Sequence, residues 1–196
     1  MFIRRSLLHR GTYPPLYNAG IVAAKRSFAV GTSKKHSERR LLKYSAEKIY
    51  GIVANVEHYK EFVPWCIDSK IISKTENAMS AELTVGYSLF KETYRSEVEL
   101  NPNKSVIAVS RQTNLFDSLR TEWSFQPARA PDTCWVTFNL EFQFKSMLYN
   151  QISELFFDDI VNHMVAAFER RCKEKAVGSA SSRGSLASSG GAARMS

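Results

Sequence analysis

The sequence lacks the short motifs that mark the commonest classes of enzyme. It contains no glycine-rich phosphate-binding loop and no nucleophile elbow around a serine. The three cysteines, Cys66, Cys134 and Cys172, do not have the spacing of metal ligands. No apolar run approaches the about 20 residues that a membrane-spanning helix needs. A phosphate-binding site, a metal site and a membrane span are therefore without support.

Acidic residues are absent from residues 1–37, which contain seven Lys or Arg. A segment that is basic, contains serine and lacks acids is typical of a mitochondrial transit peptide. The stretch Arg26-Ser27-Phe28-Ala29 resembles a mitochondrial processing site, and we expect cleavage after Phe28. The mature N-terminus is then expected between Ser27 and His36. A disordered basic arm is the alternative interpretation of residues 1–37.

The middle of the chain lacks an excess of basic residues. The whole sequence has a formal net charge of +8, but residues 38–172 contain 16 Lys or Arg and 18 Asp or Glu. The positive charge therefore lies at the two ends, and no basic stripe favours binding to nucleic acid. Residues 176–196 are mostly Gly, Ser and Ala, and we expect them to be disordered. One domain remains, residues 38–175.

Within this domain the apolar residues follow the periods of helix and strand. After a strand-like lead at residues 39–44, Ser45 suits the N-cap of a first helix, and a second short helix follows at residues 57–62. Alternation then predicts strands at residues 67–75, 79–87, 90–100, 105–113, 119–126 and 134–144.

The last apolar segment, residues 147–173, has bulky apolar residues at helical spacing. Such a helix is about 40 Å long and needs a broad partner surface. Only the strand-rich segment can supply that surface. The pattern predicts an α+β fold in which a curved antiparallel sheet is wrapped around one long C-terminal helix, with two short helices near the start.

Several short segments between residues 38 and 173 occur in a specific order and spacing. They are Phe62-Val63-Pro64-Trp65-Cys66, residues 81–86, residues 92–96, Leu115-Phe116, residues 123–127, residues 156–158 and residues 164–170. Together they resemble the mitochondrial coenzyme Q-binding proteins of the START-like, polyketide-cyclase superfamily. The resemblance implies a helix-grip fold with a lipid cavity between the sheet and the C-terminal helix.

The resemblance also implies a function. We expect a non-enzymatic protein that binds coenzyme Q (ubiquinone) and supports its delivery for respiratory electron transport and quinone biosynthesis. Its expected location is the matrix side of the mitochondrial inner membrane, in peripheral contact with the bilayer. Respiratory-chain or quinone-biosynthesis proteins are the expected partners, and no catalytic cofactor, metal or nucleic acid is expected.

Inward-facing aromatic and aliphatic residues are the candidates for the wall of such a cavity. By periodicity alone an ordinary hydrophobic core explains them, and the resemblance shifts the interpretation towards a cavity. The candidate ligand-binding residues are Phe62, Val63, Trp65, Leu83, Val85, Tyr94, Val98, Leu115, Phe116, Trp123, Phe125, Phe138, Leu140, Phe156, Ile160, Met164 and Phe168.

The uncharged loop at residues 62–66 has two interpretations. Because tryptophan favours bilayer interfaces, the loop could form a lip that covers the cavity or contacts a membrane. It could equally be a buried connector under the sheet. Leu115-Phe116, between two expected strands, raises the same two alternatives.

Two other classes of function remain open. Some bacterial members of the superfamily are described as acting on ribosomes, which suggests a ribosome-associated interaction protein. A cyclase-type enzyme that acts on a quinone precursor would need an acid or base in the cavity. Glu92, Glu141 and Asp159 are the candidates, and His163 follows Asp159 by one helical turn.

Overall fold

Seven antiparallel strands form one strongly curved sheet in the computed structural model, which describes residues 33–87, 90–111, 113, 116–145 and 150–187. Across the sheet the order is β1-β7-β6-β5-β4-β3-β2, so the first strand lies beside the last. The strands are β1 (Ser33–Leu42), β2 (Cys66–Lys74), β3 (Ala78–Tyr87), β4 (Phe90–Asn101), β5 (Ser105–Arg111), β6 (Phe116–Pro127) and β7 (Cys134–Phe144).

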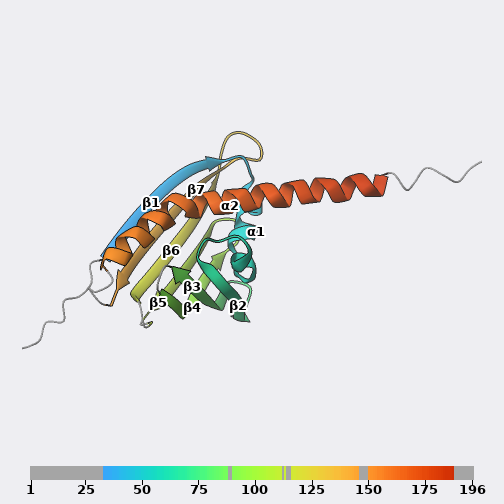
Figure 1. Ribbon diagram of the computed structural model, residues 1–196. Coiled ribbons are helices and arrows are strands. Elements are labelled where there is room, and N and C mark those ends of the chain that lie inside the picture. The colour runs from blue at the N-terminus through green and yellow to red at the C-terminus, as the bar shows by residue number, and fades with distance from the viewer. Residues whose placement is uncertain (1–32, 88–89, 112, 114–115, 146–149, 188–196) are drawn as a thin grey trace, which may run out of the picture.

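Three helical segments cover the concave side and one end of this sheet. In the first, α1 (Ala46–Val53), the side chain of Ser45 accepts a hydrogen bond from the Lys48 amide at 3.3 Å, as an N-cap does. A short 3₁₀ helix, η1 (Val56–Glu61), leads into β2. The long helix α2 (Asn150–Ala187) crosses the concave face (Figure 1). The predicted helix-grip α+β fold is confirmed.

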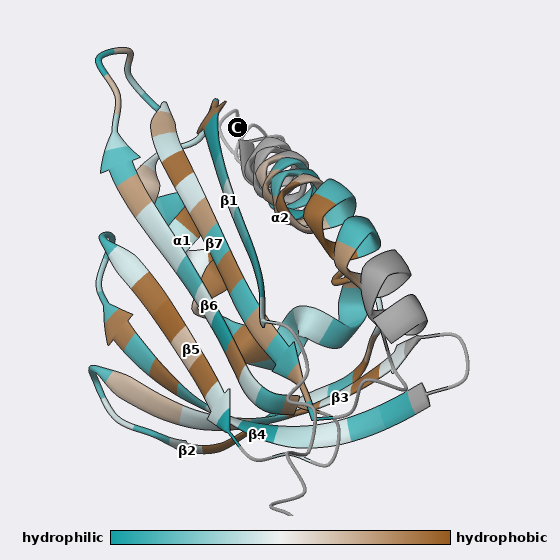
Figure 2. Ribbon diagram, turned by 90° about the vertical axis from the view of Figure 1, so that its left-hand side faces the viewer, coloured by the Kyte–Doolittle hydropathy of each residue, from teal (hydrophilic) through white to brown (hydrophobic). Residues whose placement is uncertain are grey.

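Side chains alternate between the two faces of the sheet, as the sequence periodicity predicts. Hydrophobic and hydrophilic residues alternate along β6 and β7, with α2 over the inner face (Figure 2). The inward residues Trp123 and Phe125 of β6 and Val136, Phe138 and Leu140 of β7 are all buried. One hydrophobic cluster joins these residues to α1 and to Ile160 and Phe168 of α2.

Strand β1 begins at Ser33, six residues before the strand that the sequence predicted. Residues 33–38 pair with residues 138–143 of β7, although they contain few apolar side chains. Lys35 forms an ion pair with Glu141 at 2.8 Å across this register. Residues 33–38 pair with β7 because the edge of β7 would otherwise expose unpaired backbone groups. Pairing satisfies these groups whatever the hydrophobicity of the side chains.

Helix α2 continues to Ala187, beyond the expected end at residue 173. Residues 176–187, which the sequence analysis assigned to a disordered tail, are helical. No proline lies between residues 173 and 187 to remove a hydrogen-bond donor, and each added residue of a helix gains one backbone hydrogen bond. This end of α2 projects beyond the sheet (Figure 1).

Candidate functional site

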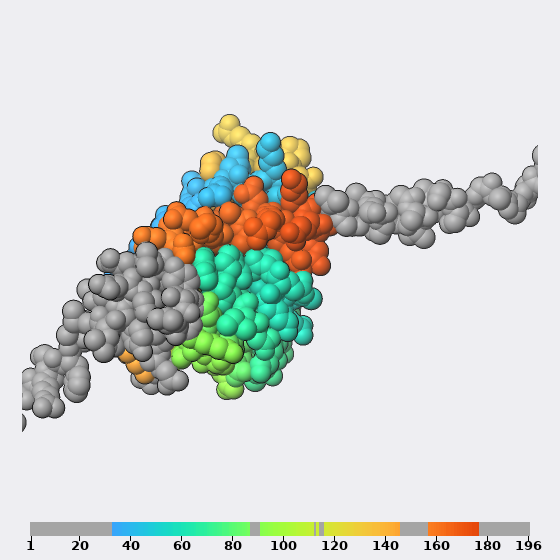
Figure 3. Space-filling model, viewed as in Figure 1, coloured from blue at the N-terminus to red at the C-terminus, as the bar shows by residue number. Residues whose placement is uncertain are grey.

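A cavity of about 120 Å³ lies between the concave face of the sheet and α2, and most of its wall is apolar. Strands β3 to β7 supply one side, α2 supplies the other, and η1 with the loop that follows it forms part of the cover. In the space-filling view, α2 is a band between β1 on one side and the region of α1 and η1 on the other (Figure 3). The described lining comes from the sheet, α2, and η1 with the loop after it, and none of it from β1 or α1.

Small side chains in the middle of the sheet explain why a space is left there. Ala81 of β3 lies opposite Ser96 of β4. One row further along, Val98 of β4 lies opposite Ala108 of β5, and Ala108 lies opposite Thr121 of β6. In a curved sheet these short side chains fill little of the volume beneath the crossing helix.

Aromatic rings fill the neighbouring part of the concave face instead. The ring of Trp123 lies 4.5 Å from that of Phe138 and 4.6 Å from that of Phe168, measured between centroids. Phe168 also meets the rings of Phe62 at 5.0 Å and Tyr59 at 5.3 Å, both edge to face. Such contacts between aromatic rings add to the free energy of burial. Of these rings, those of Tyr59, Trp123, Phe138 and Phe168 also line the cavity.

Most of the predicted ligand-binding residues are brought together by the fold. The residues that line the cavity are Val63, Trp65, Leu83, Val85, Tyr94, Val98, Phe116, Trp123, Phe138, Leu140, Ile160, Met164 and Phe168. That they contact a ligand stays a prediction. Leu115 and the side chain of Phe156 lie outside the described residues.

Two predicted residues are absent from the described lining. Phe125 packs edge to face against Tyr50 of α1, with centroids 6.2 Å apart. Phe62 packs against Phe168 with the guanidinium group of Arg171 over its ring at 5.3 Å. Both lie where α1 or η1 covers the end of the sheet, so their apolar surface is buried against these helices rather than against the cavity.

Several lining residues were not predicted from the sequence. Ser96 and Thr121 have the same inward parity as the predicted residues of β4 and β6, and Ala108 of β5 pairs with the predicted Val98. All three are small or polar, and an apolar pattern does not detect them. Leu119 of β6 and Phe142 of β7 are apolar and have inward parity, so the alternation could have identified them, but they were not among the predicted residues. The others are Val56, Tyr59, Pro64, Cys66 and Val106.

The loop between η1 and β2 covers the cavity. Val63, Pro64 and Trp65 are half-buried and line it, while Cys66 is buried. Trp65 has φ 63°, a left-handed conformation that is costly for a bulky residue. Its carbonyl accepts a hydrogen bond from the Gly86 amide at 2.9 Å, and its ring lies 6.3 Å from the exposed His163. The loop is thus held between β3 and α2.

Phe116, the other residue for which a lip was considered, belongs to the wall. It is the first residue of β6 and only 2% exposed. Its ring meets those of Tyr94, Phe142 and Phe144, at centroid distances of 6.2, 6.0 and 5.0 Å. Phe116 therefore lies inside the domain and not at its surface.

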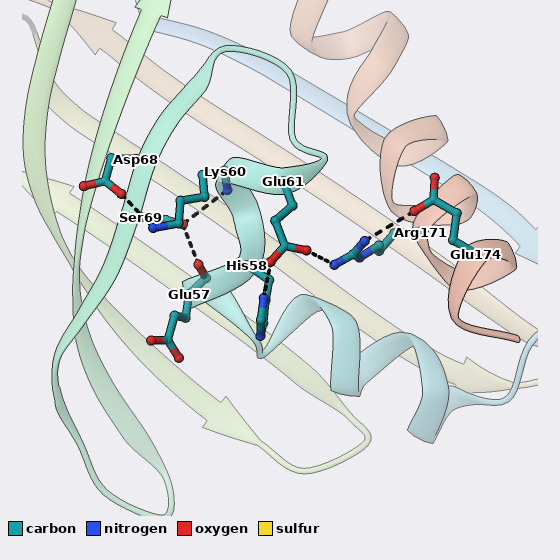
Figure 4. A network of polar contacts seen from close by, with 8 residues as sticks. All are labelled: Glu57, His58, Lys60, Glu61, Asp68, Ser69, Arg171 and Glu174. Carbon is teal, nitrogen blue, oxygen red and sulfur yellow. Dashed lines mark hydrogen bonds and ion pairs between the residues drawn. The ribbon is translucent and has the colours of Figure 1, made fainter. Parts of the chain in front are cut away.

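A polar network ties η1 to β2 and to α2 (Figure 4). The Ser69 hydroxyl donates to the Glu57 carbonyl at 3.0 Å and accepts from the Lys60 amide at 3.2 Å. The Glu61 carboxylate binds both His58 and Arg171. The hydrogen bond from His58 is the main cause of the lowered pKa of Glu61, and Arg171 lowers it further. These contacts hold the cover of the cavity against α2.

The residues considered as acids or bases for an enzyme do not line the cavity. Glu92 is buried on the inner face of β4, and Glu141 forms its ion pair with Lys35 on β1. His163 Nδ1 is 2.8 Å from the backbone carbonyl oxygen of Asp159. Cys66 does line the cavity, but burial raises the pKa of its thiol to about 11, so it is a poor nucleophile at neutral pH.

The described residues contain no cluster of three or more His, Cys, Asp or Glu side chains that could hold a metal ion. Within the same residues, none of the helices is both long and apolar enough to cross a membrane.

The chain matches the model of the family described as "Polyketide cyclase / dehydrase and lipid transport" over residues 42–169. It belongs to this family. The fold is also that of a START superfamily protein from Mycobacterium smegmatis, with a TM-score of 0.62 and 19% identity, over 71% of this chain and 97% of that one. The family is the one whose helix-grip fold the sequence predicted.

Two relatives have different names. The chain is 42% identical to the mitochondrial coenzyme Q-binding protein COQ10 homolog B of Xenopus laevis, over 70% of this chain and 57% of that protein. It is 33% identical to the ribosome association toxin RatA of Vibrio cholerae, over 72% of this chain and 96% of that protein. The chain thus spans less than two thirds of the length of the coenzyme Q-binding relative.

Proposed function

We propose that this protein binds coenzyme Q in the cavity beneath α2 and acts as a non-enzymatic carrier of it in mitochondria. The observation that carries the proposal is the mostly apolar internal cavity, found in a chain that is 42% identical to a protein named for binding coenzyme Q. Each buried CH₂ group contributes about 0.8 kcal/mol, so a five-carbon isoprenoid unit favours such a wall by about 4 kcal/mol.

The cavity must widen to hold its ligand. Its volume of about 120 Å³ is smaller than the about 150 Å³ of a cavity that accepts one benzene molecule. A substituted quinone ring is larger than benzene, so its entry requires the η1–β2 loop or α2 to move. The domain is only about 35–40 Å across, from the scaling of size with length, and most of a long isoprenoid tail then remains outside.

The binding proposal is tested by mass spectrometry of lipid extracted from protein purified from mitochondria. A quinone that co-purifies in stoichiometric amount is expected, and its absence would contradict the proposal. Titration with a short-tailed quinone then measures the binding affinity. Trp65 and Trp123 line the cavity, whereas Trp135 stacks with Arg39 at 4.5 Å, so Trp135→Phe lowers background fluorescence and leaves the quenching signal.

The proposed carrier delivers quinone for respiration and quinone biosynthesis from the matrix face of the inner membrane. The acid-free residues 1–37 support import, and cleavage after Phe28 would leave β1 whole, because β1 begins at Ser33. N-terminal sequencing of the mitochondrial protein tests this. A mature N-terminus at Met1 or Phe2, or one beyond His36, would contradict it.

Peripheral membrane contact is proposed for the Trp65 loop. Trp65→Ser is expected to weaken binding to liposomes of inner-membrane composition while changing the thermal midpoint little. A loss of stability of the size seen for an emptied aromatic core site would instead make the loop a structural connector.

A second candidate is association with ribosomes, which the match to the Vibrio cholerae protein favours. The near balance of charge in residues 38–172 argues against an RNA-binding surface. Co-sedimentation with ribosomes at low and moderate salt separates the two candidates. A cyclase activity is less favoured, because none of the three candidate carboxylates lines the cavity; conversion of a quinone precursor by the purified protein would establish it.

A further inference from the structure

The wall of the cavity contains several hydroxyl groups, and some of them form no hydrogen bond with another described residue. The hydroxyl of Tyr59 donates a hydrogen bond to the Val53 carbonyl. Those of Tyr94, Ser96 and Thr121 have no hydrogen-bond partner among the residues that the structure describes, although all three line the cavity. Among the described residues, the fully enclosed side-chain polar atoms without a partner are His36 Nε2 and Arg120 Nη1, so these three hydroxyls are open to the cavity and can bind a polar group there.

Two of these hydroxyls belong to one strand and one face. Tyr94 and Ser96 are two residues apart in β4, opposite Leu83 and Ala81 of β3, and so both point towards α2. Ser96 is only 5% exposed. The Phe116 ring meets the Tyr94 ring edge to face at 6.2 Å and 89°, which restricts its orientation. Both hydroxyl-bearing side chains thus project from the same face of β4 into the mostly apolar wall.

Burial sets the protonation state of Tyr94. It raises the pKa of the Tyr94 hydroxyl well above the ordinary value, so the group stays neutral and keeps its proton. A neutral phenol donates a hydrogen bond to a carbonyl or ether oxygen, and a serine hydroxyl can do the same. A hydrocarbon offers neither group an acceptor.

We propose that Tyr94 and Ser96 anchor the oxygen-bearing head group of an apolar lipid, with the aliphatic and aromatic wall taking the first part of its tail. This inference rests on the proposed function and adds the position and the chemistry of head-group recognition. Thr121 lies two strands away from β4 and offers a single hydroxyl, whereas Tyr94 and Ser96 offer two donors to one head. The ligand class is a lipid with carbonyl or ether oxygens at one end, as in a quinone.

The test compares a short-tailed quinone with an isoprenoid hydrocarbon that has no head group. Both affinities are measured on the full chain by displacement of a fluorescent apolar probe. Tyr94→Phe is expected to weaken quinone binding about tenfold, the loss of one well-formed hydrogen bond, and Ser96→Ala a few-fold. Affinity for the hydrocarbon is expected to stay the same in both variants.

Tyr50→Phe is the matched control, because the Tyr50 ring packs on Phe125 outside the described lining of the cavity. It should change neither affinity. Equal quinone affinity in wild type, Tyr94→Phe and Ser96→Ala would overturn the anchor while leaving the proposed function standing. Selective loss of quinone in Thr121→Val instead would also overturn it. A wild-type protein that binds neither compound would overturn both proposals.

Discussion

Two neighbouring parts of the concave face are built from the same alternating strands and differ only in how they are filled. Around Trp123, the rings of Phe138 and Phe168 lie within 4.6 Å between centroids. Around Ala108 and Thr121, which face each other across β5 and β6, short side chains leave the cavity. Inward alternation therefore yields packed core in one place and a cavity in the other, and side-chain size makes the difference.

The hollow part is unusual for a protein interior. Interiors are packed about as densely as organic crystals, and an empty volume destabilises the fold because its lining atoms lose contacts. A fold that keeps such a space in the middle of its sheet sacrifices stability there. That loss is recovered when an apolar ligand binds in the space and stabilises the folded state.

The packed part should respond most strongly to truncation. Phe168→Ala removes a ring that contacts Trp123, Phe62 and Tyr59, and we expect a loss of about 3–5 kcal/mol in the free energy of unfolding, measured in urea. Ile72→Ala, at a position 47% exposed on β2, is the control and should cost less than about 0.5 kcal/mol. A loss below about 1 kcal/mol for Phe168→Ala would mean that this part is not core.

The hollow part should tolerate a charge that the packed part would not. Met164 is half-buried on α2 and lines the cavity. In Met164→Lys the long aliphatic stem can follow the apolar wall while the ammonium group reaches water. We expect a cooperative melt with a stability loss of at most about 2 kcal/mol, and no co-purifying quinone.

An unfolded Met164→Lys protein would show that Met164 is tightly packed core. A folded variant that still carries quinone would place the ligand elsewhere. Circular dichroism with lipid analysis of the same preparation distinguishes the three results.

A larger side chain in the hollow part should abolish quinone binding without lowering the stability of the fold. Ala108→Leu adds apolar atoms to the cavity, and we expect quinone binding to be lost while the free energy of unfolding stays the same or rises by about 1 kcal/mol. Ala167→Leu on α2 is the matched control, since Ala167 is only 1% exposed and lies outside the described lining. Overpacking there should cost about 1–3 kcal/mol. If both variants were equally destabilised in urea, the two alanines would share one kind of environment.

The smallest effect is expected where the cover of the hollow part meets α2. The pKa of Glu61 is lowered by His58 and Arg171, so its contribution to stability is present above the unfolded-state pKa of about 4.5 and is lost as pH falls through the lower folded-state value. We expect Glu61→Gln to lower the urea midpoint slightly at pH 7 and not at pH 3. Glu57→Gln is the control; an equal effect of the two, or a Glu61→Gln effect that persists at pH 3, would contradict the pairing.

Periodicity in the sequence determined most of the architecture. The alternation in residues 134–144 predicts β7 with its observed bounds, and the three-and-four spacing in residues 147–173 predicts a long helix over the sheet. Both signals are local, because the side chains of a strand or helix take fixed directions from its backbone. The start of β1 and the end of α2 differ from expectation, because β1 depends on the free edge of β7 and nothing local stops α2.

Only the tertiary structure decided which inward side chains face the cavity. Phe125 and Trp123 have the same parity on β6, yet one packs on α1 and the other lines the cavity. Ser96 and Ala108 are inconspicuous in the sequence and become part of the site because their partners across the sheet are also small. Whether a gap is filled depends on the combined volume of side chains several strands apart and on where α2 crosses them. No local pattern in the sequence indicates that combined volume.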